Sequence, residues 1–130
     1  MTDEEFLRAL ENCTLPESEF GHRAHVRAAY LYLKKSDFAE ALDRIRKSIR
    51  AYAAHQGKPD RYHETITVAY LALIHQCIFE RGDAGSWATF AQSNPELFNP
   101  NLLGKFYDRE VLDSKMARRI FLLPGSKSEA

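Results

Sequence analysis

Apolar residues recur at three- and four-residue steps along almost the whole chain, and no segment keeps the strict alternation that is typical of a strand. This spacing predicts an all-α fold. Capping residues and helix breakers divide the pattern into about six or seven helices. We expect these helices to form one domain over residues 1–124, an antiparallel helical bundle. The predicted helices span 3–12, 22–35, 37–56, 63–81, 87–94, 101–107 and 114–122. A polar segment, 125–130, is expected to be a mobile tail.

Charge and composition narrow the classes of function. The 130 residues include 18 Lys and Arg against 18 Asp and Glu, so the formal net charge is +0. A neutral chain lacks the cationic field that holds a polyanion, and we expect no nucleic-acid partner. The apolar run 68–79 is too short to span a bilayer and no basic leader precedes it, so we expect a cytoplasmic protein with no membrane partner. No nucleotide-binding glycine motif or nucleophile elbow occurs.

Histidines are the main chemical feature. Short connections between the second, third and fourth predicted helices favour an up, down, up path. On that path the starts of the second and fourth helices meet the end of the third, so His22, His25, His55 and His63 gather at one end of the bundle. His75 should lie apart, about 18 Å further along its helix.

This cluster predicts a metal site. His22 and His25 stand three residues apart, which places their Cβ atoms roughly 5–6 Å apart on one helix face. With His63 they form three imidazole ligands, a set that suits catalytic zinc or non-haem iron. Glu64 is the candidate catalytic residue, as a general base on bound water or as a hydrogen-bond acceptor for a ligating histidine. An enzyme of this kind would perform metal-assisted hydrolysis or oxygen chemistry.

Other residues are candidates for the surroundings of that pocket. Tyr30, His55 and Tyr62 could contact the metal ligands or a small-molecule ligand. Arg109 and Arg118 could reach the pocket and orient an anionic substrate through their guanidinium groups. The basic run at 44–50 is interleaved with acidic residues and is interpreted as a solvated helix face.

A second interpretation stays open beside the metal site. Histidines at helix starts also cap backbone groups or bond buried tyrosines, and a carboxylate such as Glu64 is favourable in any first helical turn. On this interpretation the histidines are structural, and the protein is an interaction or dimerisation module, a homo-oligomer that associates through an outer helix face.

Three runs together resemble a widespread family of small bacterial helical proteins. They are Phe-Gly-His-Arg-Ala-His-Val-Arg-Ala-Ala-Tyr at 20–30, Tyr-His-Glu-Thr-Ile-Thr at 62–67, and the segment from Tyr107 through Arg109 and Arg118 to Phe121. The resemblance implies that His22, His25, His63 and Glu64 belong to the family's motifs. It implies no activity.

Overall fold

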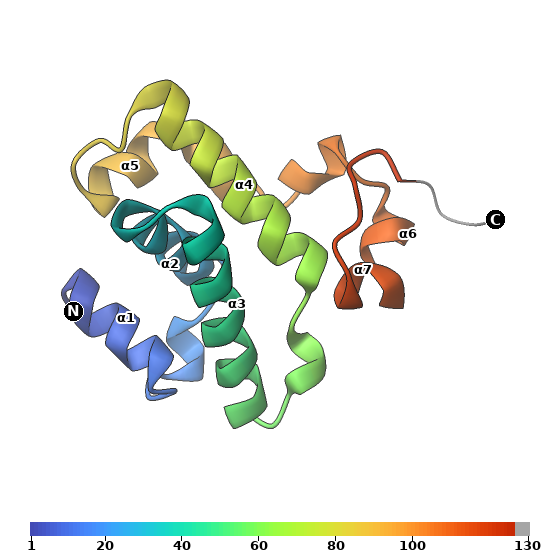
Figure 1. Cartoon of the computed structure of the whole chain (residues 1–130), viewed down its shortest axis with the longest axis horizontal. Helices are drawn as coiled ribbons and strands as arrows, with labels where there is room; N and C mark the ends of the chain where they lie inside the picture. Colours follow the sequence, from blue (N-terminus) through green and yellow to red (C-terminus); the bar gives the residue numbers. More distant parts are fainter. Residues whose placement is uncertain (127–130) are drawn as a thin grey trace.

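The computed structural model describes residues 1–126, and seven α-helices account for most of them (Figure 1). No strand occurs in this part of the chain, so the predicted all-α class is confirmed. The helices are α1 (Asp3–Glu11), α2 (His22–Lys35), α3 (Phe38–His55), α4 (Glu64–Arg81), α5 (Trp87–Ser93), α6 (Arg109–Leu112) and α7 (Lys115–Arg119). Short 3₁₀ turns connect them: η1 (Glu17–Glu19), η2 (Pro59–Arg61), η3 (Pro95–Phe98) and η4 (Leu102–Lys105).

Local sequence explains where the first helices begin and end. Thr2 and Glu5 form a capping box at the start of α1, and Asp37 accepts a hydrogen bond from the backbone of Glu40 at the start of α3. Gly82 ends α4 with a φ of 83°, a backbone conformation that favours glycine. These signals are local, so the sequence predicts α1 to α4 to within one or two residues.

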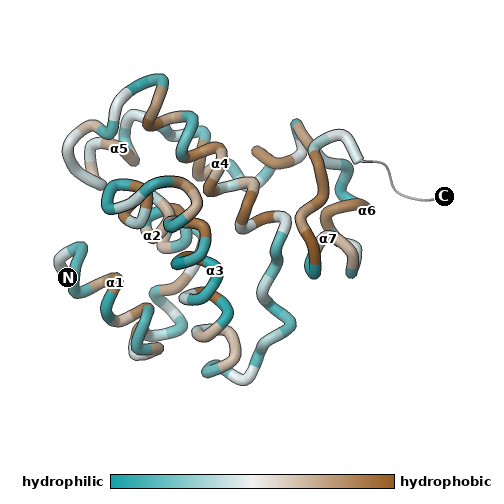
Figure 2. The backbone as a smooth tube through the Cα atoms, viewed as in Figure 1, coloured by the Kyte–Doolittle hydropathy of each residue, from teal (hydrophilic) through white to brown (hydrophobic). Residues whose placement is uncertain are grey.

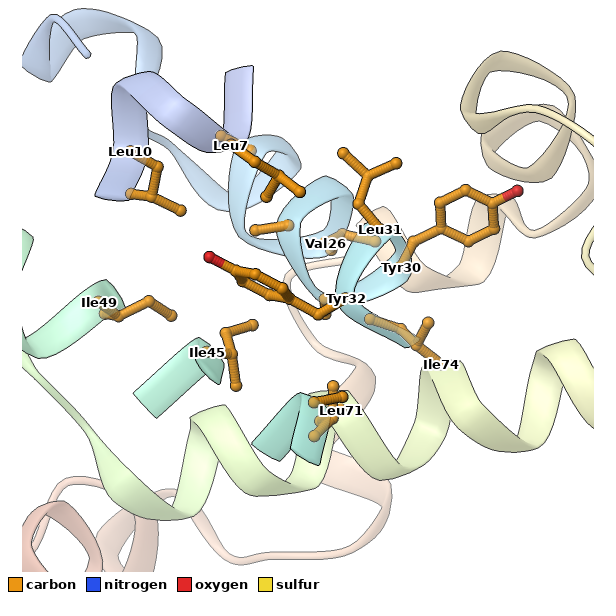
Figure 3. Packing of buried hydrophobic residues seen from close by; sticks show 14 of the residues in the cluster. Leu7, Leu10, Val26, Tyr30, Leu31, Tyr32, Ile45, Ile49, Leu71 and Ile74 are labelled. Carbon is orange, nitrogen blue, oxygen red and sulfur yellow. The ribbon is translucent and has the colours of Figure 1, made fainter. Parts of the chain in front are cut away.

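The main core lies among α1, α2, α3 and α4 (Figure 3). Leu10, Ile45 and Ile74 are almost completely buried there. Tyr32 also lies in the core, and its hydroxyl donates to Glu11 at 2.8 Å and lies 2.7 Å from the Ser48 hydroxyl. The predicted apolar faces therefore meet as the helical periodicity requires.

The path through α2, α3 and α4 follows the predicted up, down, up order, but with an offset. The His22 ring at the start of α2 packs against Tyr70, with ring centroids 4.8 Å apart, rather than against His63. Tyr30, further along α2, donates to the backbone carbonyl of Asp83 beyond the end of α4. The helices α2 and α4 thus run in the same direction, and α4 begins about two turns, roughly 10 Å, before the level of His22. The longer α3 explains this offset.

The last third of the chain departs from the prediction. The helix predicted at 101–107 is the 3₁₀ turn η4, and α6 was not predicted. The last helix, α7, ends at Arg119 rather than at 122, because Ile120 is extended. Figure 2 shows the hydrophobic segment that follows α7 beside α4. In this part of the molecule Tyr107 and Val111 pack against Ala69 in a second, smaller core.

The predicted tail begins inside the described structure. The Gly125 amide donates to the carbonyl of Phe106 at 2.8 Å, and Ser126 donates twice to Leu123. The rest of the tail, 127–130, lies outside the described residues. Among residues 1–126, no helix combines the length and the apolar character that are needed to cross a bilayer.

Candidate functional site

His63 caps α4 and has both ring nitrogens in hydrogen bonds. Its Nδ1 accepts from the backbone N–H of Ile66 at 3.1 Å, and its Nε2 donates to the carbonyl of Leu112 at 2.7 Å. Only the uncharged tautomer with hydrogen on Nε2 makes both bonds. Burial lowers the pKa of His63, which favours the same uncharged form. The ring thus has a structural role, as the second interpretation of the sequence allowed.

Thr65 extends this attachment between α4 and the C-terminal segment, and Thr67 adds a bond within the first turn of α4. The fully buried Thr65 hydroxyl donates to the carbonyl of Ile120 at 2.8 Å and accepts from the amide of Leu122 at 3.1 Å. Thr67 donates to the carbonyl of His63 inside the first turn. The run Tyr-His-Glu-Thr-Ile-Thr therefore holds the C-terminal segment on α4.

Glu64 is engaged in a network of its own. One oxygen of its carboxylate accepts from the Tyr62 hydroxyl at 2.5 Å and from Arg46 Nε at 3.0 Å, and Arg50 lies 3.7 Å from the same oxygen. Burial and the Glu64 carboxylate raise the pKa of Tyr62 to about 12, so the phenol keeps its proton. The Arg50 guanidinium lies 4.7 Å from the centre of the Tyr62 ring. Glu64 therefore positions two arginines of the run that was interpreted as a solvated face.

The side chains of His22 and His25 point in different directions, so they do not face a common ligand position. His22 Nε2 donates to the carbonyl of Leu97 at 2.8 Å and contacts Tyr70, towards α4 and η3. The His25 ring stacks on Phe20 with centroids 4.3 Å apart, on the side of α3. Desolvation by burial, with a smaller effect from His22, lowers the pKa of His25 to about 4, so this ring is uncharged at neutral pH.

The predicted metal ligands are consequently not assembled. In residues 1–126 no three His, Cys, Asp or Glu side chains come together in a group that could hold a metal ion. The two-turn offset of α4 separates His63 from His22, and backbone carbonyls occupy the Nε2 atoms of both rings. The zinc or iron site through His22, His25 and His63 therefore has no geometric basis in the described structure.

The other predicted site residues fall into two groups. Tyr30 lies in the core, stacked on Phe90 with centroids 4.5 Å apart. His55 is exposed at the end of α3, and Arg109 is 85% exposed and pairs with Asp113. Arg118 and Tyr62, by contrast, do line a cavity together with His25. Arg118 thus lines the same cavity as His25, whereas the Arg109 side chain extends into solvent.

A large concave feature, which we call the basic cleft, lies between η2 and α7. It has a volume of about 1110 Å³. Of the described residues that line it, six are cationic and Asp60 is the only acidic one. The cations are Arg50, Lys58, Arg61, Lys115, Arg118 and Arg119.

A smaller cavity, which we call the aromatic cavity, adjoins the basic cleft. It has a volume of about 240 Å³ and is lined by the rings of Phe20, His25 and Tyr52 beside Ile49 and Ala53 of α3. The two cavities share four lining residues and therefore lie next to each other. The shared residues are Lys58, Arg61, Tyr62 and Arg118.

The sequence analysis missed most of the basic cleft. Its cations come from two regions that are far apart in the chain, residues 50–61 and 115–119, and the balanced total charge hides their concentration. One local signal is present: three of the five residues at 115–119 are basic and none is acidic. That signal does not show which surface the basic residues face.

No family model, no curated protein and no solved structure matches this chain. The resemblance to a bacterial helical family stays a prediction.

Proposed function

We propose that this protein binds a small anionic ligand in the basic cleft. One observation supports this most directly: six cationic side chains surround one cavity in a chain whose formal net charge is +0. Like charges this close raise the free energy of the folded state, and a bound anion removes that cost. Guanidinium groups also match phosphate and carboxylate groups with two parallel hydrogen bonds.

Several of the cations have bonding capacity left. Lys115 and Arg119 make no ion pair among the described residues. Arg118 donates one N–H to the carbonyl of Asp60 at 3.0 Å, which orients its guanidinium and leaves its other N–H groups for a ligand. Arg50 is held over Tyr62 and beside Glu64. The cleft therefore presents two guanidinium groups that are held in position, Arg118 and Arg50, beside the exposed Lys115 and Arg119.

The size of the cleft favours a small molecule. Ligand sites for small molecules have volumes of about 300–1,000 Å³, and the volume of the basic cleft, about 1110 Å³, is close to this range. A small-molecule ligand also agrees with the prediction that the protein has no nucleic-acid partner. The experiment below tests that prediction with a short oligonucleotide.

The first test compares two arginines that differ in placement. Inorganic pyrophosphate is titrated into the protein by calorimetry at low ionic strength. We expect Arg118→Gln to weaken binding about tenfold, because a hydrogen bond to a charged group is worth about 1.5–3 kcal/mol. Arg109→Gln is the matched control, since the solvent-exposed Arg109 does not line the cleft.

Three results would contradict the proposal. They are the absence of pyrophosphate binding at low salt, equal weakening by the two substitutions, and binding of a short single-stranded oligonucleotide but not of pyrophosphate. Binding should also weaken as salt is added, because salt screens exposed cations.

A further inference from the structure

The aromatic cavity differs in chemistry from the basic cleft. The rings of Phe20 and His25 are stacked with an angle of 25° between their planes, and Tyr52 lies 4.6 Å from Phe20 at a tilt of 57°. Ile49 and Ala53 add aliphatic side chains to the lining, and Glu17 and Gln56 add polar ones. Cations of the basic cleft lie where the two cavities join. The site thus has an apolar, ring-lined part and a positively charged part.

His25 differs from the polar residues Glu17 and Gln56 of this cavity because its ring is part of the aromatic lining. Its side chain is partly buried, and its ring makes no hydrogen bond with any residue of 1–126. An uncharged imidazole has one donor and one acceptor nitrogen. Among the described residues, the only buried side-chain polar atom without a hydrogen-bond partner is Arg27 Nε, so the His25 nitrogens are accessible to solvent and to a ligand. Tyr52 does not compete for it, because its hydroxyl donates to the carbonyl of Leu15 at 2.6 Å.

The volume of the aromatic cavity limits what can enter. A cavity of about 150 Å³ in another protein accommodates benzene, so about 240 Å³ accommodates one six-membered ring with a substituent. Larger ligands fill sites of about 300–1,000 Å³. A ring between aromatic side chains gains offset or edge contacts in addition to burial.

We infer that the ligand is a single aromatic ring that carries one anionic group. The ring enters the aromatic cavity between Phe20, His25 and Ala53, and the anionic group lies at Lys58, Arg61 and Arg118. This inference rests on the proposed anion binding and adds the chemical class of the ligand. A polar atom of the ring would hydrogen-bond to His25.

The test compares two probes that have the same charged group, phenyl phosphate and methyl phosphate. Their affinities are measured for the full chain and for Ala53→Leu, which fills the cavity without changing any charge. Ala54→Leu is the matched control, because Ala54 is the exposed neighbour on the same helix. We expect the full chain to bind phenyl phosphate at least about tenfold more tightly than methyl phosphate. Ala53→Leu should bring the ratio close to one, and Ala54→Leu should leave it unchanged.

The outcomes separate this inference from the proposed function. Equal binding of the two probes by the full chain would overturn the ring but not the anion site. Binding of neither probe nor of pyrophosphate would overturn both. A preference for phenyl phosphate that survives in Ala53→Leu would place the ring elsewhere and overturn the inference. If Ala53→Leu does not fold, Phe20→Leu removes the stacking surface while it leaves every cation in place, and the same loss of preference is expected.

Discussion

The start of α4 contains a buried, uncharged histidine and the aromatic cavity a partly buried, uncharged one, yet the two rings are used in opposite ways. His63 uses both ring nitrogens to hold protein segments together. His25 uses neither nitrogen with the described residues and lines a cavity instead. A histidine with no unused donor or acceptor has a structural role, whereas one left without partners beside a cavity is available to a ligand. Residue type alone did not distinguish the two cases.

Removal of the His63 side chain should give the largest effect. His63→Ala deletes a helix cap and leaves the carbonyl of Leu112 without its partner, so we expect the free energy of unfolding to fall by about 3–4 kcal/mol. Urea unfolding followed by circular dichroism measures the change. His55→Ala is the control and should have almost no effect, because His55 is exposed. If His63→Ala and His55→Ala lowered the free energy of unfolding by similar amounts, His63 would have no special structural role and its contrast with His25 would be lost.

Acid should destabilise the protein through its buried histidines. The folded-state pKa of His25, about 4, is below the value of 6.5 for an exposed histidine. The unfolded chain therefore binds more protons in this range, and stability present above pH 6.5 is lost as the pH falls towards 4. One pKa unit corresponds to 1.36 kcal/mol, so we expect the His25 contribution to decrease by about 2 kcal/mol between pH 7 and pH 5.

His25→Gln isolates this contribution because glutamine does not titrate. Unfolding free energies of the two proteins at pH 7 and pH 5 should differ in their pH dependence by that amount, and His55→Gln should leave the dependence unchanged. The lowered pKa of His63 has the same sign and remains in both proteins. Parallel pH profiles for the original protein and His25→Gln would mean that the ring is hydrated rather than buried.

The smallest effect should come from Glu17, an exposed carboxylate in the lining of the aromatic cavity. Its carboxylate pairs with Lys58 at 2.7 Å and with Arg61 at 3.2 Å, and the hydrogen bond with Lys58 is the main cause of its lowered pKa. A bound ligand must compete with this carboxylate for the same cations. We expect Glu17→Gln to strengthen pyrophosphate binding about threefold, a small effect because exposed ion pairs are weak.

Glu19→Gln removes the same charge from the same turn and is the control, since Glu19 makes no ion pair within residues 1–126. Equal strengthening by both substitutions would indicate a general effect of net charge. No change in either variant would mean that Glu17 does not occupy the anion position.

Local signals in the sequence were sufficient for the helices but not for the site. Caps and periodicity located α2 at 22–35, and short connections predicted the up, down, up path. The level at which α4 crosses α2 depends on how the side chains of α2, α3 and α4 pack, which no local pattern encodes. The predicted cluster of histidines is not formed, because α4 packs against α2 at a different level from the one that the cluster requires. The irregular C-terminal third failed for a related reason, because its conformation depends on bonds to Thr65 and His63 far away in the chain.

The sequence by itself determined the helical class, the bounds of α1 to α4 and the apolar faces that form the main core, because these follow from periodicity and capping within a few residues. Only the tertiary structure decided which histidine is a cap and which lines a cavity. It also brought cations from α3, η2 and α7 to one cleft in a chain with balanced charge. Electrostatic interactions and cavities depend on distances in space, and residues far apart in the chain set those distances only when the helices pack.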